Sequence, residues 1–487
     1  MVVNTLHLHP EPIQFGTDGW RGVLGVDITI ERILPVAAAA ANELAFRSAQ
    51  DLQSRKVIIG YDRRFLAPEL AIAVSSAVRG CGLQPLLTET SVPTPACSWS
   101  VVKMKALGAI VITASHNPPE WIGLKIKGPD GASVERDFTE AVEKRLAAGG
   151  FSLPIEAPTE TFDGRKEHLD GLRRKFDIPG LVSGLKKIGL QIIVDPMHGS
   201  AAGCIGELLG QKKEESDLIQ EIRSNRDPLF GGTAPEPLAK NIDQLISKVK
   251  SSSSLNRPAL GIVFDGDGDR IAAVDENGRF CSTQLLMPLL IDHLARFREL
   301  PGSVIKTVSG SDLMRLVAED VGRDVVELPV GFKYIAKEML AGEVLVGGEE
   351  SGGIGFGMHI PERDALFAAL LVLEAIKDSG QPLGVRLNSL ETRFGRSHYD
   401  RLDIRLPTMQ SRERLEAFLN KTPPSIVNDV PVLEVIAIDG IKLRLGRSYW
   451  LMFRFSGTEP LLRIYCEAPT HDLVESTLKW GKELAEK

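Results

Sequence analysis

The alternation of long apolar runs with helix-like segments constrains the fold of this chain more than any other feature. Five uninterrupted runs have the β-branched character of strands buried on both faces: KVIIGYD (56–62), ALGAIVITAS (106–115), LQIIVDP (190–196), ALGIVFDGD (259–267) and EVLVGGEE (343–350). Periodic segments such as ITIERILPVAAAAANELAF (28–46) lie between these runs. Because strands that alternate with helices usually pair in parallel, the pattern predicts α/β domains with largely parallel sheets.

Length and local composition indicate several domains. At roughly 150 residues per domain, the 487 residues correspond to about three domains, or four smaller ones. A segment rich in Pro, Gly and Thr at 149–164 is typical of a linker, and a new region starts near Phe280. The segment 393–407 opens a more alternating pattern that ends in a helix-like stretch, which predicts an α+β fold there. The predicted domains are 1–157, 158–279, 280–390 and 391–487.

Composition excludes several classes of protein. With 43% apolar and 25% charged residues, the chain is neither disordered nor collagen-like. Its net charge of −7 leaves no basic excess for binding nucleic acid. The five cysteines form no CxxC pair, which favours a reducing compartment. There is no signal-peptide pattern, and apolar stretches such as 365–376 are too short to span a bilayer. We therefore expect a cytoplasmic protein that binds neither nucleic acid nor membranes.

Polar clusters follow several of the predicted strands, at the edge where open α/β sheets place their ligands. The first cluster is TASHNPPEWIGLKIK (113–127), directly after the run GAIVI. We expect its turn to expose Ser115 at the sheet edge, where the hydroxyl could act as a nucleophile. His116 is poorly placed as its base, because neighbouring side chains usually diverge, and the GxSxG elbow is absent. An ordinary serine turn that caps a helix also fits this segment.

The second cluster, FDGDGDR (264–270), predicts a metal site. Asp265, Asp267 and Asp269 alternate with glycines, so a flexible backbone can bring three carboxylates to one point. Hard oxygen ligands without His or Cys suit Mg²⁺ rather than zinc. An EF-hand loop does not fit, since Arg270 occupies the place that requires glycine and the flanks are strand-like. The alternative is a solvated acidic turn.

Two further clusters are suited to a sugar and to a phosphate. GGEESGGIGF (347–356) sets paired acids among glycines, so it can offer carboxylates to sugar hydroxyls, although a glycine-rich turn with two exposed glutamates is the better explanation of this segment taken alone. RFSGTEPLLRIYCE (454–467) combines hydroxyl and backbone donors with two arginines, a good phosphate cradle, and its alternative is a plain hairpin. A serine, a Mg²⁺ site, a sugar-binding loop and a phosphate-binding loop together indicate phosphoryl transfer on a sugar phosphate.

On these motifs the chain resembles the α-D-phosphohexomutase superfamily, which comprises the phosphoglucomutases and phosphomannomutases. The resemblance covers essentially the whole chain, with the motifs in the family's order: FGTDGWRG (15–22), TASHNP, DGDGDR, GEESGG and RFSGTEP. It implies three related α/β domains and a smaller α+β C-terminal domain around a central cleft. The four predicted domains would then carry, in order, the catalytic serine loop, the metal loop, the sugar loop and the phosphate loop.

The resemblance also implies roles for individual residues. Ser115 would carry the phosphoryl group, and its phosphate would complete the Mg²⁺ shell of Asp265, Asp267 and Asp269. Lys125 or His116 would assist proton transfer. The flanking and substrate-binding residues would be Arg21 and Lys125 beside the phosphoryl group, Arg270 beside the metal, Glu349 and Ser351 on the sugar, and Arg454, Ser456, Gly457, Thr458 and Arg463 on the non-reacting phosphate.

One departure bears on the substrate. Some dual-specificity bacterial members carry a histidine in the loop written here as PVGFKYI (329–335). This chain has Lys333 instead, similar to the glucose-type pattern, so we expect Lys333 to face the sugar, although a surface lysine on a helix is the alternative. The sequence GEES, in place of GEMS, also favours glucose.

The resemblance implies a Mg²⁺-dependent phosphoglucomutase, with glucose 1,6-bisphosphate as intermediate and activator. Phosphomannomutase and glucose-1,6-bisphosphate synthase are the alternative activities, and a catalytically silent sensor of sugar phosphates is the non-enzymatic one. We expect small hexose phosphates as the only ligands besides the metal, and a monomer or weak dimer. The C-terminal domain would close over the cleft as a lid, with a hinge near Arg393.

Overall fold

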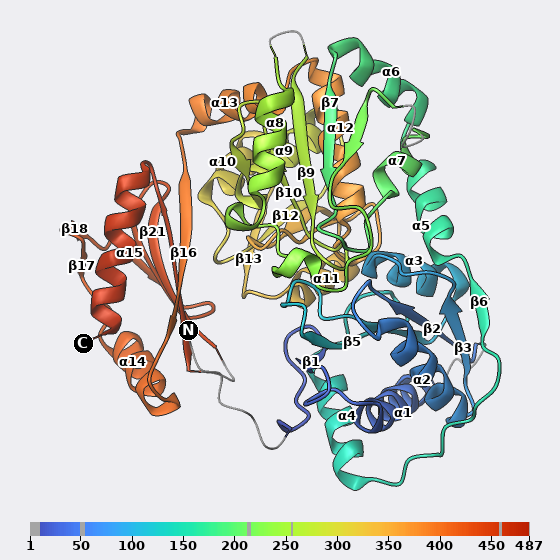
Figure 1. The fold of residues 1–487 in the computed structure, drawn as a ribbon. Helices are drawn as coiled ribbons and strands as arrows, with labels where there is room; N and C mark the ends of the chain where they lie inside the picture. The colour runs from blue at the N-terminus through green and yellow to red at the C-terminus, as the bar shows by residue number, and fades with distance from the viewer. Residues whose placement is uncertain (1–9, 49–53, 212–215, 255–256, 457–459, 487) are drawn as a thin grey trace.

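The computed structural model describes residues 10–48, 54–211, 216–254, 257–456 and 460–486. These residues form four units, each built around one large sheet. The first three pack into one body, and the C-terminal unit stands beside them as a separate lobe, drawn in orange and red in Figure 1. This arrangement confirms the predicted four-domain architecture.

The first unit has a six-stranded sheet in the order β1-β5-β4-β2-β3-β6. Its strands are β1 (Trp20–Val23), β2 (Lys56–Tyr61), β3 (Gln84–Thr88), β4 (Gly108–Ile112), β5 (Trp121–Lys127) and β6 (Glu160–Phe162), and its helices are α1 (Ile30–Arg47), α2 (Ala67–Gly80), α3 (Thr94–Met104) and α4 (Arg136–Ala148). The strands β4, β2, β3 and β6 pair in parallel, and β5 is antiparallel to both of its neighbours, β4 and β1. Strand β6 comes from beyond residue 157, so this sheet extends past the predicted end of the first domain.

The second unit has the sheet order β11-β10-β9-β7-β8, in which β9, β7 and β8 are parallel. Its elements are α5 (Gly164–Arg173), α6 (Ile178–Ile188), β7 (Gln191–Asp195), α7 (Cys204–Leu208), β8 (Ile219–Glu221), the short 3₁₀ turns η1 (Phe230–Gly232) and η2 (Ala239–Asn241), α8 (Asp243–Ser252), β9 (Ala259–Phe264), β10 (Ile271–Val274) and β11 (Phe280–Cys281). The edge strand β11 adds residues 280–281 to this sheet.

The third unit has the sheet order β13-β12-β14-β15, with only β15 antiparallel to its neighbour. Its elements are α9 (Thr283–Arg296), β12 (Ser303–Thr307), α10 (Asp312–Asp320), β13 (Val325–Leu328), α11 (Phe332–Ala341), β14 (Val344–Gly348), β15 (Ile354–Phe356), α12 (Ala365–Ser379) and α13 (Leu383–Phe394). Helix α12 is buried along nearly its whole length, because it packs between this unit and α6 of the second. Among the described residues, no helix combines the length and apolar character needed to cross a bilayer.

The fourth unit is an antiparallel sheet in the order β16-β22-β21-β20-β19, covered by helices, and it confirms the predicted α+β fold. Its elements are β16 (His398–Arg405), α14 (Met409–Lys421), β17 (Ile426–Val427), β18 (Val430–Pro431), β19 (Glu434–Ile436), β20 (Ile441–Gly446), β21 (Tyr449–Phe455), β22 (Leu461–Ala468) and α15 (His471–Ala485). Its apolar core is distinct from the core that the second and third units share.

A strand pair recurs in the first three units. In each, a fully buried parallel strand is followed along the chain by an antiparallel neighbour: β4 by β5, β9 by β10, and β14 by β15. The loop that joins each pair contains one of the motifs found in the sequence. In the fourth unit, the antiparallel pair β21–β22 flanks the fourth motif. The fold therefore places the four polar clusters predicted from the sequence between adjacent antiparallel strands, whereas the fifth motif, FGTDGWRG, runs into β1.

The C-terminal lobe is fastened to the third unit by buried polar groups. The Glu467 carboxylate accepts hydrogen bonds from Asp312 N (2.9 Å), from Trp450 Nε1 (2.5 Å) and from the hydroxyls of Ser311 and Ser397. Nearby, Lys442 Nζ donates to the Val308 carbonyl oxygen at 2.8 Å, and burial lowers the pKa of this lysine to about 8. A buried donor that lost its acceptor would cost free energy, so these hydrogen bonds determine how the C-terminal lobe packs against the third unit.

Glu467→Gln tests this packing. It replaces one carboxylate oxygen, which accepts hydrogen bonds, with an amide nitrogen, which cannot accept them from the donors around it. We expect the free energy of unfolding of the lobe to fall by about 3 kcal/mol, measured by urea titration followed by tryptophan fluorescence. Glu434→Gln is the matched control, since Glu434 is exposed and forms an ion pair with Arg444 at 3.2 Å. Equal urea midpoints for the two variants would contradict the assignment.

Candidate active site

The loops that follow β4, β9 and β14 meet at one place. Ser115 Oγ donates a hydrogen bond to Asp265 Oδ2 at 3.0 Å, which joins the first loop to the second. An antiparallel bridge between Arg270 and Gly353 joins the second loop to the third. Three predicted clusters from three different units therefore share one site.

Ser115 is buried in the structure, so the expectation that its turn is exposed was wrong. The cover comes from the second unit: backbone at Gly266 lies so close that a Cβ there would be 2.6 Å from the Ser115 carbonyl oxygen. Ser115 itself adopts a φ of +53°, a strained conformation for a residue with a side chain. A sequence-local argument could not reveal this cover, because the covering residues lie about 150 positions away.

His116 also differs from the expectation. The left-handed conformation of Ser115 turns the two side chains toward each other, and Ser115 Oγ lies 3.2 Å from His116 Nδ1. Burial, together with the positive charges of Arg270 and Arg21, holds the pKa of His116 well below its usual value. The imidazole is therefore neutral and within hydrogen-bond distance of the serine hydroxyl.

The aspartate cluster has the composition and geometry of a Mg²⁺ site. Asp265, Asp267 and Asp269 are fully buried, and each places a carboxylate oxygen within 4.8 Å of the others. Among the described residues, Asp267 Oδ1 and Asp269 Oδ1 have no hydrogen-bond partner. Buried carboxylate oxygens without a partner are costly, and a hard divalent cation would satisfy them. The residues present thus fit the predicted Mg²⁺.

Lys125, on β5, is the central cation of the site. Its Nζ lies 2.7 Å from Asp269, 2.8 Å from Asp267 and 3.0 Å from Asp18. Burial alone would lower the pKa of this lysine, but the carboxylates, Asp18 foremost, hold it above its usual value. The predicted Lys125 therefore lies in the site as a permanent positive charge.

Arg363 is a site residue that the sequence analysis missed. Its guanidinium lies 2.7 Å from Asp18, 3.0 Å from Asp269 and 3.6 Å from Glu349, so it links all three units. The signal available in the sequence was the charged stretch PERD immediately before an apolar helix. Asp364 of that stretch caps α12 through its side chain, which fixes where the preceding arginine points.

The remaining predicted residues of this site lie at its margin. Arg21 donates to Asn117 Oδ1 at 2.9 Å, and Arg270 Nε lies 3.9 Å from Asp269 Oδ1. Burial raises the pKa of Glu349 to about 7, against the lowering effect of Arg363. Ser351 follows in the same loop and is partly buried. Lys333 is the second residue of α11 and is also partly buried, with its ammonium 5.1 Å from the centroid of the Tyr334 ring.

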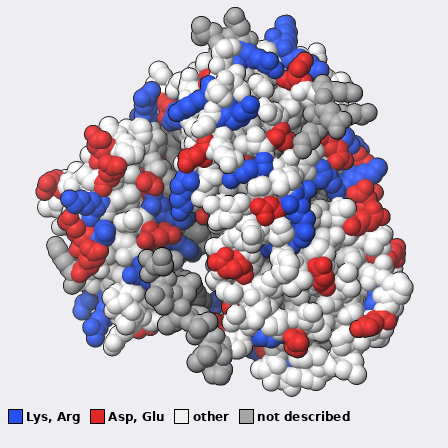
Figure 2. Space-filling view, in the orientation of Figure 1, with Lys and Arg blue, Asp and Glu red and all other residues white. Residues whose placement is uncertain are grey.

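The phosphate motif is on the C-terminal lobe. Arg454 on β21 pairs directly with Arg463 on β22, so both side chains leave the same face of the sheet. Asp439 holds Arg454 through a 2.8 Å bond to Nε, and Ser456 N closes the hairpin on the Leu461 carbonyl oxygen. Gly457 and Thr458 lie outside the described residues. Figure 2 shows a deep groove between this lobe and the rest of the molecule.

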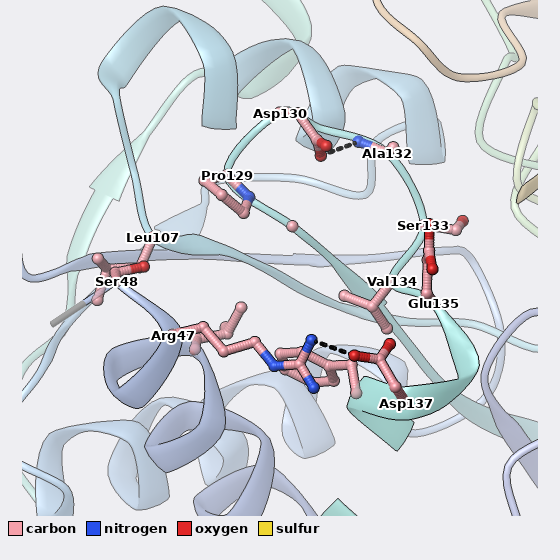
Figure 3. A pocket seen from close by; sticks show the side chains of 13 residues that line it. Arg47, Ser48, Leu107, Pro129, Asp130, Ala132, Ser133, Val134, Glu135 and Asp137 are labelled. Atoms are coloured by element: carbon pink, nitrogen blue, oxygen red, sulfur yellow. Dashed lines mark hydrogen bonds and ion pairs between the residues drawn. The ribbon is translucent and has the colours of Figure 1, made fainter. Parts of the chain in front are cut away.

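A separate pocket lies in the first unit (Figure 3). It has a volume of about 240 Å³ and lies between the end of α1, the loop 128–135 and the start of α4. Arg47 and Asp137 form an ion pair in its wall, and none of the predicted site residues lines it. The chemistry predicted from the sequence is therefore not in this pocket.

Comparisons with known proteins agree with the geometry. Models of the phosphoglucomutase/phosphomannomutase family match the chain in four parts: alpha/beta/alpha domain I at 12–152, domain II at 166–278, domain III at 283–394 and the C-terminal domain at 409–479. A phosphoglucosamine mutase from Parafrankia sp. is 30% identical, covering 94% of this chain and 96% of the relative. A phosphoglucomutase/phosphomannomutase from Thermococcus kodakarensis is 26% identical, covering 97% and 98%.

The fold has a close counterpart among solved structures. The structure of a protein from Thermus thermophilus, assigned as a phosphomannomutase, aligns with a TM-score of 0.84 at 31% identity and covers 98% of this chain and 100% of that one. The four family matches together include every motif loop. The chain therefore belongs to the phosphoglucomutase/phosphomannomutase family of the α-D-phosphohexomutase superfamily.

Proposed function

We propose that this protein is a Mg²⁺-dependent phosphohexomutase that works through a phosphoserine at Ser115. The observation that carries the proposal is the 3.0 Å contact between Ser115 Oγ and Asp265, within a buried cluster of three aspartates and Lys125. Asp265, Asp267 and Asp269 would hold the Mg²⁺, which supplies positive charge to the transferring phosphoryl group. Such a site has the parts that phosphoryl transfer needs, namely positioning and neutralisation of charge.

In the proposed reaction, a hydroxyl oxygen of the sugar phosphate attacks the phosphorus of phosphorylated Ser115. The bond from phosphorus to Ser115 Oγ breaks, and a bisphosphate forms. After the sugar reverses its orientation, Ser115 Oγ takes the other phosphoryl group, which regenerates the phosphoserine and releases the isomer. His116 is placed to exchange a proton with Ser115 Oγ, because its Nδ1 lies 3.2 Å away, whereas Lys125 contacts carboxylates.

The other residues take binding roles in this proposal. Arg454 and Arg463, side by side on one sheet face, would grip the non-reacting phosphate together with Ser456, Gly457 and Thr458. Glu349 and Ser351 would bind sugar hydroxyls, and Lys333 would face the sugar. Positive charge beside the transferring group would come from Arg21, Arg270 and Arg363, the last of which contacts both Asp269 and Glu349.

We propose glucose phosphates as the substrates, with glucose 1,6-bisphosphate as the intermediate and activator. Support comes from Lys333 and from the GEES sequence, both of which resemble the glucose-type pattern. Glucosamine phosphates are the second candidate, because a relative that spans nearly the whole chain is named a phosphoglucosamine mutase.

Ser115→Ala should abolish turnover and leave the fold intact, because the change removes only the hydroxyl contacts to Asp265 and His116, a loss of about 1 kcal/mol. Intact-mass analysis should find one phosphate on the wild type after incubation with glucose 1,6-bisphosphate and none on the variant. Ser100→Ala is the matched control, a buried serine on α3 whose hydroxyl donates to the Ala96 carbonyl oxygen. A phosphorylated, active Ser115→Ala enzyme would refute the phosphoserine.

Glu349 should give the enzyme a pH dependence near neutrality. Its folded-state pKa of about 7 is above the ordinary 4.5, so the carboxyl is protonated below that pH and ionised above it. An ionised carboxylate accepts hydrogen bonds from sugar hydroxyls, and kcat/KM should therefore rise through about pH 7. Its contribution to folding is favourable below pH 4.5 and lost as pH rises through about 7.

The check is the pH profile of kcat/KM for the wild type and for Glu349→Gln, with glucose 1-phosphate. The variant should retain the inflection due to the substrate phosphate and lose the one due to the carboxyl. Identical profiles would show that Glu349 does not bind the sugar.

A product panel tests the proposed function as a whole. Glucose 1-phosphate, mannose 1-phosphate and glucosamine 1-phosphate are each incubated with Mg²⁺ and a trace of glucose 1,6-bisphosphate, and products are followed by phosphorus NMR. We expect conversion of glucose 1-phosphate to the 6-phosphate at the highest kcat/KM, with only trace free bisphosphate. Faster conversion of the glucosamine or mannose phosphate would show that this sugar phosphate, and not glucose phosphate, is the preferred substrate. Stoichiometric release of bisphosphate would indicate a synthase. Binding of sugar phosphates without any turnover would indicate a sensor.

A further inference from the structure

We infer that Arg64 is the positioning residue of the catalytic serine loop, an inference that rests on the proposed role of Ser115. Arg64 follows β2, far in sequence from the motif at 113–118. Its side chain is completely buried, and the hydrogen bonds that it makes to the described residues go to Asp62 and to backbone carbonyls of 115–121. It acts on the reaction through the backbone of the loop that carries Ser115.

Every N–H of the Arg64 guanidinium donates a hydrogen bond. Nη2 donates to the carbonyl oxygens of Ser115 (2.8 Å) and Asn117 (2.7 Å). Nη1 donates to those of Pro118 (2.8 Å) and Trp121 (2.9 Å), and Nε donates to Asp62 Oδ2 at 3.2 Å. A guanidinium has five donors in a fixed plane, so one side chain sets the positions of four carbonyl groups at once.

The opposite side of the Ser115 peptide is held by the same network. Thr113 Oγ1 accepts the Ser115 backbone N–H at 2.8 Å and donates its own proton to Asp62 Oδ2 at 2.6 Å. Asp62 in turn accepts from Arg64. The backbone on both sides of Ser115 is therefore tied to one buried ion pair, which stabilises the left-handed φ of +53° at the serine.

Residues of the second unit close over this network. The Phe230 ring lies 4.9 Å from the Arg64 guanidinium carbon, and Arg226 donates to the Arg64 carbonyl oxygen at 3.1 Å. The same unit carries Asp265, which accepts the hydrogen bond of Ser115 Oγ. Arg64 thus fixes the serine backbone at the boundary between the unit that carries the serine and the unit that carries the aspartates.

A lysine cannot reproduce this arrangement, because its ammonium has three donors on a flexible stem and cannot reach four carbonyls in one plane. In Arg64→Lys the Ser115 loop should lose some of the hydrogen bonds that now hold its carbonyl groups. The arginines proposed to bind the phosphate, Arg454 and Arg463, are unchanged. Since a displacement of about 1 Å from reactive geometry can cost about 100-fold in rate, we expect kcat to fall about 100-fold with KM for glucose 1-phosphate nearly unchanged.

Three variants and one control make the test. Arg64→Lys removes the planar guanidinium, and Thr113→Val removes the hydroxyl that accepts the Ser115 N–H. Arg64→Ala leaves a cavity that guanidinium, added as its chloride, can occupy. The control is Arg279→Lys, which breaks a bidentate arginine–carboxylate pair outside the serine loop: Arg279, between β10 and β11, makes two bonds of 2.7 Å to Glu391 of α13. The measurements are kcat and KM, and amide hydrogen exchange of the peptide that covers 113–121.

We expect lower kcat and faster exchange at 113–121 for Arg64→Lys and Thr113→Val, and wild-type kcat for Arg279→Lys. Guanidinium should restore part of the activity of Arg64→Ala, and methylammonium, a cation without the fork, should not. If Arg64→Ala does not fold, the results for Arg64→Lys and Thr113→Val decide whether Arg64 positions the loop.

Wild-type kcat and exchange in folded Arg64→Lys would overturn the inference, as would an equal loss of kcat in Arg279→Lys. The proposed function fails separately, by absence of turnover and of phosphoserine in the wild type. Hydrogen exchange at 113–121 in Arg64→Lys still decides whether Arg64 positions the loop in that case.

Discussion

The burial of charge at Lys125 is the constraint on which the rest of this structure depends. An ammonium removed from water needs carboxylates around it, and here they come from Asp18 in the first unit and from Asp267 and Asp269 in the second. Arg363 of the third unit then balances the same acids. The charges are neutralised only when the three units pack together, so assembly of the fold and assembly of the site are one event.

The sequence predicted the elements that build this frame, for a clear physical reason. Strands such as β4 and β9 are buried on both faces, and such strands appear as continuous apolar runs that need no tertiary information. Edge strands carry no such signal: β6 and β11 have three and two residues, and both lie beyond the boundaries that composition suggested. Short edge strands are defined by their partner and not by their own residues.

The residues of the candidate site likewise fall into those that the sequence predicted and those that it did not. Residues clustered in one loop, such as Asp265 to Asp269, could be found from spacing alone. Asp18 and Arg363 were missed, because the contacts that place them in the site are with residues of other units, far away in the chain. The burial of Ser115 and its contact with His116 depend on a backbone angle and on a loop from another unit. Those features arise from packing between domains, which cannot be predicted from a local sequence pattern.

The common core of the second and third units has a consequence for how such an enzyme can change its substrate. Helices α6 and α12 and the strands around them form one continuous apolar mass, and the bridge between Arg270 and Gly353 joins the loops above it. The loops 265–270 and 348–353 are therefore held at one separation. Under the proposed function, a new sugar preference would come from side chains at 349–353 or on α11, and not from moving these two loops apart. Specificity would then change by single substitutions, at a distance between the proposed metal and sugar positions that the core sets.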